Sequence, residues 1–132
     1  MAVQNYGTVL VTLADSDKEE ALPLIRRFYN LGFNIEATRG TAMFLKENGI
    51  RTRIKQKISE GSSDIPDSIR QGHIAYVINT SKLDSTDSQK DGYEIRSLAV
   101  ETNTTMFTSL DTVRVLLDVL EDITITISTI DS

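Results

Sequence analysis

The chain has no cysteine, no tryptophan, two prolines and one histidine. Without cysteine it can form neither a disulfide nor a thiolate metal site, as is typical of a cytoplasmic protein. The lone histidine, His73, has no second histidine or cysteine with which to hold a metal, and a surface position is expected for it. The apolar runs are too short to span a bilayer, and residues 1–6 lack the charged-then-apolar plan of a signal peptide. We therefore expect a cytoplasmic protein with no metal and no membrane partner.

Basic charge is also scarce. Fourteen Lys and Arg residues against 19 Asp and Glu residues give a net charge of −5. Nucleic-acid binding depends on basic surface that neutralises phosphates, so a general nucleic-acid partner is not expected. The four Phe and four Tyr are scattered along the chain, and no aromatic platform for stacking bases is visible. Any basic site must therefore be local.

The length of 132 residues and the hydrophobic content of 39% suit one domain with a single core. Strand-like and helix-like segments alternate, which predicts an α/β domain with a mainly parallel sheet. The expected strands are 8–13, 33–37, 52–54, 74–78 and 104–107, and the expected helices are 17–31, 42–49, 65–72, 93–101 and 110–120. The polar segment 80–92 is expected to be an exposed, mobile loop. Residues 123–128 alternate like a strand and are expected at an edge or mobile.

The most informative local feature is the turn Thr38-Arg39-Gly40-Thr41, which joins an alternating apolar run to a helix-like run. Such a turn gathers backbone N–H groups and two hydroxyls around one point. The helix dipole at that point favours an anion, above all a phosphate. The same residues also suit a simple N-cap, so the turn alone leaves both interpretations open.

Polar residues follow two other expected strands. The run Thr8–Leu13 leads to Lys18, in the first turn of a helix, where a cation is unfavourable unless an anion shares the site. The run Ile74–Ile78 ends in Asn79-Thr80-Ser81. In open α/β sheets, ligands bind beyond the carboxyl ends of the strands. These residues are therefore expected to line one crevice.

Four segments in this order and spacing resemble the methylglyoxal-synthase-like domain: Asp17-Lys18, Ala37–Ala42, Lys57–Gly61 and Ile78–Ser81. Within that group the chain is most similar to the C-terminal allosteric domain of the carbamoyl-phosphate synthase large subunit. The resemblance implies a three-layer α/β fold, a five-stranded parallel sheet flanked by helices. It covers residues 7–120, so residues 1–6 are expected to be a linker remnant and 121–132 a C-terminal tail of a fragment excised from a larger enzyme.

The resemblance also implies a site for a nucleotide monophosphate effector of the UMP or IMP class. The effector phosphate is expected at Lys18, Thr38, Gly40, Thr41 and Lys57. The ribose and base are expected at Thr12, Asn79, Thr80 and Ser81. Thr108 matches a position near an ornithine site and the contact with the synthetase domain. No catalytic residue or cofactor is expected in the domain itself. The parent enzyme uses ATP with Mg or Mn, and its synthetase domains and small glutaminase subunit are the expected partners.

Two other functions are compatible with this architecture. The first is a methylglyoxal synthase-type lyase acting on dihydroxyacetone phosphate, with Asp64 as the base. The accompanying histidines are missing, however, and Asp64 and Asp67 are rather expected to cap the short helix. The second is the cyclohydrolase domain of the bifunctional purine enzyme. That domain normally shows Lys-Thr-Leu-His-Pro where this chain has Lys57-Ile58-Ser59-Glu60-Gly61, which counts against it.

Overall fold

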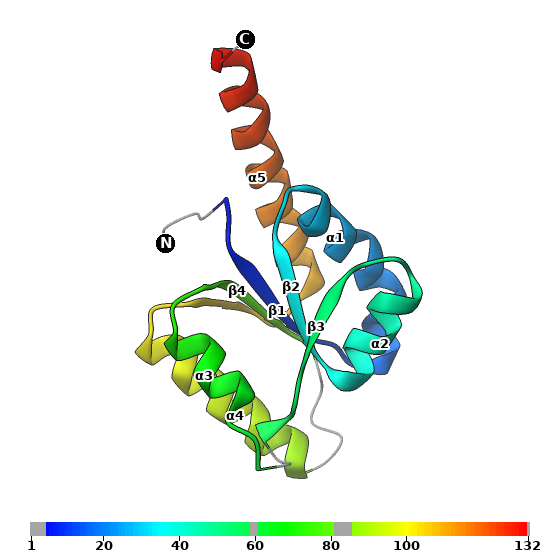
Figure 1. Ribbon diagram of the computed structural model, residues 1–132, viewed down its shortest axis with the longest axis vertical. Coiled ribbons are helices and arrows are strands. Elements are labelled where there is room, and N and C mark those ends of the chain that lie inside the picture. The colour runs from blue at the N-terminus through cyan, green and yellow to red at the C-terminus, as the bar shows by residue number, and fades with distance from the viewer. Residues whose placement is uncertain (1–4, 59–60, 81–85, 132) are drawn as a thin grey trace.

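The computed structural model describes residues 5–58, 61–80 and 86–131, and it contains one five-stranded sheet (Figure 1). Its strands are β1 (Thr8–Thr12), β2 (Asn34–Thr38), β3 (Thr52–Lys55), β4 (Ile74–Asn79) and β5 (Thr105–Phe107). Their order is β3-β2-β1-β4-β5, and every neighbouring pair is parallel. The predicted α/β class with a parallel sheet is confirmed.

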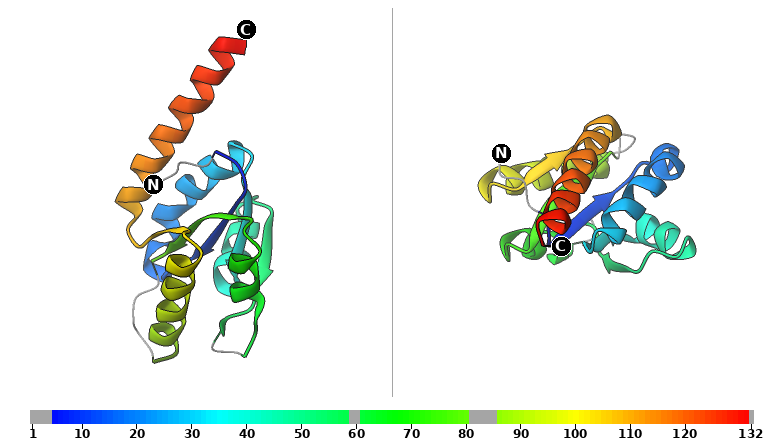
Figure 2. Two further views of the ribbon diagram at one scale, coloured as in Figure 1. Left: turned by 90° about the vertical axis from the view of Figure 1, so that its left-hand side faces the viewer. Right: turned by 90° about the horizontal axis from the view of Figure 1, so that it is seen from above.

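Helices cover both faces of the sheet (Figures 1 and 2). A short 3-10 turn, η1 (Asp15–Asp17), precedes the helices α1 (Lys18–Asn30), α2 (Arg39–Glu47), α3 (Asp64–Arg70), α4 (Thr86–Glu101) and α5 (Leu110–Asp131). The larger core cluster joins α1, α2 and α5 to one face, and the smaller joins α3 and α4 to the other. Val9 and Val11 of β1 enter the first cluster and Leu10 the second, which explains why this strand is apolar throughout.

The prediction of an exposed loop over residues 80–92 is wrong from Thr86 onward, because α4 already begins there. Residues 81–85 lie outside the described part of the chain. The buried residues Ile95, Leu98 and Ala99 supply the helical periodicity, and all three lie in the second half of α4. Because a helix can extend beyond its apolar stripe, hydrophobic periodicity does not detect such an extension.

The prediction for residues 123–128 is also wrong, since α5 continues to Asp131. The two-residue alternation of isoleucine suggested a strand. Ile123 and Ile127, however, are also four residues apart, a spacing that places two residues on one face of a helix. The first turns of α5 pack on the sheet through Val113, Leu117 and Leu120, and the helix propagates from them.

One ion cluster ties α5 to α1. The Arg27 guanidinium pairs with the Glu121 carboxylate and lies 2.9 Å from Asp118 Oδ1. The hydrogen bond from Arg27 lowers the pKa of Glu121 below its usual value. The side chains of Arg27 and Glu121 remain 29% and 38% exposed, so solvent screens the pair.

We expect Glu121→Gln to lower the free energy of unfolding by about 0.5–1 kcal/mol at pH 7. Because the folded-state pKa of Glu121 is lowered, its stabilisation is complete above the unfolded pKa and is lost as the pH falls through the folded pKa. Urea unfolding of parent and variant between pH 7 and pH 2 should therefore converge at the acidic end. Glu47→Gln, an exposed carboxylate at the end of α2, is the control. A gap between parent and variant that persists at pH 2 contradicts the electrostatic explanation.

Candidate functional site

Three parallel strands end at one edge of the sheet, and two helices begin there (Figure 1). Thr12 ends β1, Thr38 ends β2 and Asn79 ends β4. The chain passes from β1 through η1 into α1, and from β2 directly into α2. The edge therefore brings together the N-terminal turns of α1 and α2 with most of the predicted site residues.

Thr38 and Thr12 meet side by side at this edge. The Thr38 hydroxyl donates to the Thr12 hydroxyl over 3.2 Å. Thr38 is also the N-cap residue of α2, with extended backbone, yet its side chain makes no capping hydrogen bond. The N-cap interpretation is therefore wrong for Thr38, because its hydroxyl is oriented toward β1. The first-turn amides of α2 receive no cap from it.

Two other threonines hold the turn that leads into α1. Thr41 Oγ1 accepts a hydrogen bond from the Leu13 amide at 3.1 Å, and Thr80 Oγ1 accepts one from the Ala14 amide at 3.2 Å. Thr41 is 2% exposed and Thr80 6%. An accepting hydroxyl keeps its own proton for donation. Both side chains thus hold the segment that leads from β1 to Lys18. Each hydroxyl can still donate one hydrogen bond.

Lys18 lies directly over the start of α2. Its ammonium is 2.7 Å from Asp15 Oδ1, and 3.7 Å from the point where a Cβ on Gly40 would stand. The Lys18 ammonium is therefore close to the first turn of α2. α2 begins at Arg39, three residues before the start at residue 42 that the sequence predicted. Gly40 and Thr41 therefore belong to its first turn.

The charge of Lys57 also affects the Asp15 carboxyl. The hydrogen bond and the charge of Lys18 lower the pKa of the Asp15 carboxyl, and the Lys57 charge adds to that shift. Lys57 itself is exposed. Both lysines thus raise the positive potential near Asp15, beside the start of α2. We call Lys18, Lys57 and residues 38–41 the anion cradle.

The remaining predicted residues lie along the same edge. Asn79 is 7% exposed and its Nδ2 is 3.6 Å from the Cβ position of Gly92 in α4. The Thr80 amide donates to the Thr12 carbonyl at 3.0 Å. Thr108 follows β5 and is exposed. Ser81 falls outside the described residues.

Asp64 and His73 do not form an acid–base pair. Asp64 Oδ2 accepts the Gln56 amide at 3.0 Å, and Ser62 Oγ accepts the Asp64 amide at 3.1 Å. The prediction that Asp64 caps α3 is therefore wrong, since its carboxylate holds the chain after β3 instead. His73 precedes β4, and its Nε2 is 3.2 Å from Glu36 Oε2. It is a half-exposed partner of a buried carboxylate rather than a plain surface residue.

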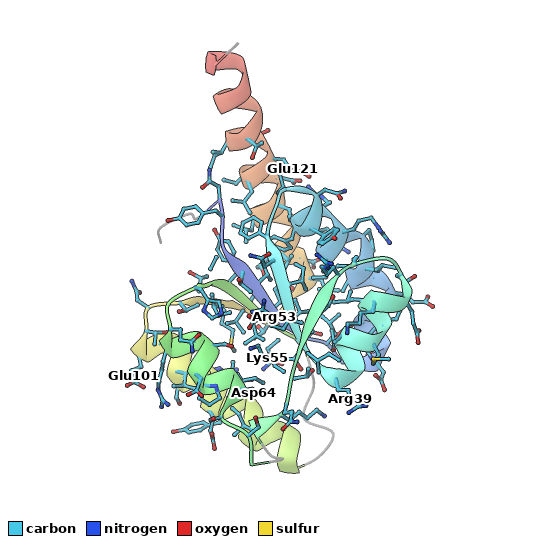
Figure 3. The ribbon with its side chains drawn as sticks, viewed as in Figure 1. Arg39, Arg53, Lys55, Asp64, Glu101 and Glu121 are labelled. Atoms are coloured by element: carbon cyan, nitrogen blue, oxygen red, sulfur yellow. The ribbon has the colours of Figure 1, made fainter. Side chains whose placement is uncertain are left out.

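The sequence interpretation missed three charged residues near the edge. Asp15 is the ion-pair partner of Lys18, and its place three residues earlier on the chain was a usable signal. Lys55, labelled in Figure 3, ends β3, and its ammonium lies 3.9 Å from the carboxylate of Glu36, which is buried in β2. A charged residue inside an otherwise apolar strand is the signal that Glu36 offered.

Two kinds of site are not found within the described ranges. Residues 5–58, 61–80 and 86–131 contain no group of three His, Cys, Asp or Glu residues placed to hold a metal ion. In the same ranges, no helix has the length and apolar character needed to cross a bilayer. The groups at the edge are lysines, hydroxyls, an amide and backbone N–H groups, together with the exposed carboxylate of Asp15. The donors and cations among them suit an anionic ligand.

Comparison with known proteins places the chain beside one family and a similar solved structure. The family model described as the MGS-like domain matches residues 20–108. The crystal structure of methylglyoxal synthase from Elizabethkingia anophelis NUHP1 is similar, with a TM-score of 0.67 and 18% identity. The match covers 87% of this chain and 79% of that one. At this level of identity the structural likeness concerns the fold.

Proposed function

This chain belongs to the MGS-like domain family, and from that premise we propose that it is an effector-binding regulatory domain of the carbamoyl-phosphate synthase large subunit type. The effector is a nucleotide monophosphate of the UMP or IMP class. Its phosphate occupies the anion cradle. Its ribose and base extend along the edge toward Thr12, Asn79 and Thr80.

The observation that carries the proposal is the first turn of α2 beneath Lys18. Thr38 gives this turn no side-chain cap, and Gly40 lies close to the ammonium. Backbone N–H groups at a helix start together with a lysine above them form a phosphate site without further residues. The dipole of α2 adds to the attraction.

The charges of the cradle also favour a dianionic ligand. Asp15, the present partner of Lys18, has a 94% exposed side chain and can turn into solvent at little cost. A phosphate monoester carries a charge of about −1.5 to −2 near neutral pH. A phosphate with this charge can pair with Lys18 and Lys57 at the same time. The carboxylate of Asp15 carries a single negative charge and balances only one of the two lysines.

In this proposal the domain has no catalytic residue and holds no cofactor of its own. Ligand binding alters the activity of adjoining synthetase domains in the cytoplasm, where the parent enzyme makes carbamoyl phosphate for pyrimidine and arginine biosynthesis. That enzyme consumes ATP with Mg or Mn and receives ammonia from a small glutaminase subunit. Thr108, exposed after β5, is the proposed contact with the synthetase domain and the ornithine site.

A lyase acting on dihydroxyacetone phosphate is the second candidate, and the fold shared with methylglyoxal synthase favours it. Proton abstraction next to a carbonyl needs a base and an electrophile for the enediolate oxygen. Asp64, the candidate base, is engaged by the Gln56 amide. His73, the single histidine, is paired with Glu36. The regulatory domain is therefore the better supported function.

We expect the chain to bind UMP or IMP in calorimetric titration and to form no methylglyoxal from dihydroxyacetone phosphate. Asp64→Asn should leave nucleotide affinity within about twofold of the parent, because Asp64 is not part of the cradle. Production of methylglyoxal is followed by its reaction with a dicarbonyl-trapping reagent. Turnover by the parent chain that disappears in Asp64→Asn reverses the order of the two candidates.

A further inference from the structure

Basic residues occupy every second position along the edge strand β3 and the residues beside it. They are Arg51, Arg53, Lys55 and Lys57. Residues 48–59 contain no Asp or Glu, although the whole chain has a net charge of −5. Side chains two residues apart in a strand lie on the same face of the sheet. Arg53 and Lys55 therefore share one face of β3, and Arg51 directly precedes the strand in the same alternation.

The buried carboxylate of Glu36 accounts for one of these cations. Glu36 is 2% exposed, and its Oε1 has no hydrogen-bond partner within the described part of the chain. The cation that faces this oxygen is Lys55, whose ammonium lies 3.9 Å away and whose side chain is 18% exposed. Because a buried charge needs a nearby counter-charge, Lys55 is assigned to Glu36. Lys57 already belongs to the anion cradle, so two arginines remain.

Arg51 and Arg53 are both open to solvent. The Arg53 side chain is 74% exposed, and its guanidinium lies 3.8 Å from Glu36 Oε2, beyond hydrogen-bond distance. That oxygen already has His73 Nε2 at 3.2 Å. Arg51 is exposed and forms no ion pair with another residue that the structure describes. Both guanidinium groups are therefore available to a partner that brings carboxylates.

β3 is also an open edge of the sheet. It pairs with β2 on one side, and no strand of the described residues lies on its other side (Figure 1). Two of its four residues are exposed and one is half-buried, whereas β4 is buried along its whole length. An edge strand presents unpaired backbone N–H and C=O groups on its outer side. Such an edge can accept an extended segment of another protein as an added strand.

The opposite face of β3 is apolar at the same edge. Ile54 is 37% exposed, and it is the register partner of Ala37, which lies in the larger core cluster. Ile54 therefore faces the α2 side of the sheet, and Arg53 faces the other side. A strand added beside β3 would place alternate side chains next to the arginines and next to Ile54. The segment that fits best has Asp or Glu alternating with apolar residues.

A second copy of β3 does not fit this edge. Like charges that lie directly opposite each other in paired strands are destabilising, so two copies of the basic strand repel each other. Charged residues on edge strands do protect proteins against such self-pairing. Charges of either sign would give that protection, however, and the segment 48–59 carries basic residues alone. The uniform sign favours an acidic partner.

We propose that the β3 edge is a docking site for an acidic protein segment, which joins the five-stranded sheet as an additional edge strand. Its carboxylates pair with Arg51 and Arg53, where the guanidinium geometry allows two parallel hydrogen bonds to each carboxylate. Its apolar side chains pack beside Ile54. Arg51 stands at the start of β3, away from the carboxyl ends of the strands where the cradle lies. The docking site is therefore independent of the nucleotide effector.

The test is fluorescence anisotropy with a labelled synthetic peptide in which Glu and Val alternate. The parent chain should bind this peptide, and the double variant Arg51→Gln/Arg53→Gln should bind it at least about tenfold more weakly, because two charge-assisted contacts are lost. Arg96→Gln, at an exposed arginine of α4, is the matched control and should bind as the parent does. The melting temperature of the double variant should stay near that of the parent, since both side chains are exposed. Its affinity for UMP should also be unchanged.

Amide hydrogen exchange separates strand addition from a purely ionic contact. The bound peptide should slow exchange within residues 51–55, and a peptide with the same Glu and Val residues in two separate blocks should bind much more weakly. Equal binding of the block peptide, equal binding by the double variant, or unchanged exchange in β3 overturns the proposal. Tighter binding of a single-stranded oligonucleotide at the same arginines also overturns it, because the edge is then a nucleic-acid surface. A parent chain that does not bind the alternating peptide refutes the docking site and leaves the proposed function in place.

Discussion

Lys18→Ala and Lys57→Ala are expected to lose nucleotide binding and yet to melt near the parent temperature. In the proposed site, each lysine makes one charge-assisted contact with the effector phosphate, and losing such a contact costs about 1.5–3 kcal/mol. This corresponds to a roughly ten- to hundredfold weaker affinity. Folding should hardly change, because Lys57 and Asp15, the partner of Lys18, are both exposed. Titration with UMP and IMP measures the first effect and calorimetric melting the second.

Lys46→Ala is the matched control for both variants. Lys46 belongs to α2, the helix whose first turn forms part of the cradle, but it is exposed and lies in the last turn. Its alanine variant should bind as the parent does. If Lys57→Ala binds UMP and IMP as tightly as the parent, the cradle has been placed on the wrong residues. If Lys46→Ala weakens binding as much as Lys57→Ala does, the effect is one of net charge and not of a site.

The sheet could be predicted from the sequence because its signal is local. The two central strands β1 and β4 are largely apolar runs, and the buried stripe of α1 repeats at helical spacing through Ala21, Leu24, Ile25 and Phe28. The start of α4 and the end of α5 could not be predicted in the same way. α4 begins before, and α5 continues beyond, the residues whose apolar spacing indicated a helix.

The meeting of the polar strand ends could be predicted, but the contacts between them could not. Strand ends rich in hydroxyls pointed to one edge, and the structure does bring Thr12, Thr38 and Thr80 together there. The hydrogen-bond partner of each hydroxyl is distant in the sequence. Thr38 and Thr12 are 26 residues apart, and Thr80 and Ala14 are 66 residues apart. The same holds for Glu36 and His73, which are 37 residues apart and meet only because β2 and the start of β4 lie on either side of β1.

Phe28→Ala is expected to lower the free energy of unfolding by about 3–5 kcal/mol, a large part of the stability of a domain of this size. Phe28 is fully buried in α1 and packs edge-on against Phe33, with ring centroids 5.4 Å apart. It also lies 6.4 Å from the ring of Tyr76 in β4. Truncation leaves a cavity between α1 and the sheet that rigid neighbours fill only in part. Tyr29→Ala, at a 37% exposed position on the same helix, should cost much less.

This variant also separates stability from binding. A ligand that binds only the folded state raises stability by RT ln(1 + [L]/Kd), whatever the starting stability. Saturating UMP or IMP should therefore raise the stability of Phe28→Ala by as much as that of the parent, because Phe28 does not belong to the cradle. The same nucleotide should raise the stability of Lys57→Ala far less, although without ligand that variant is as stable as the parent. Urea unfolding with and without nucleotide measures all of these shifts. A ligand-induced shift that is lost in Phe28→Ala but retained in Lys57→Ala would place the effector against the aromatic core instead of at the strand ends.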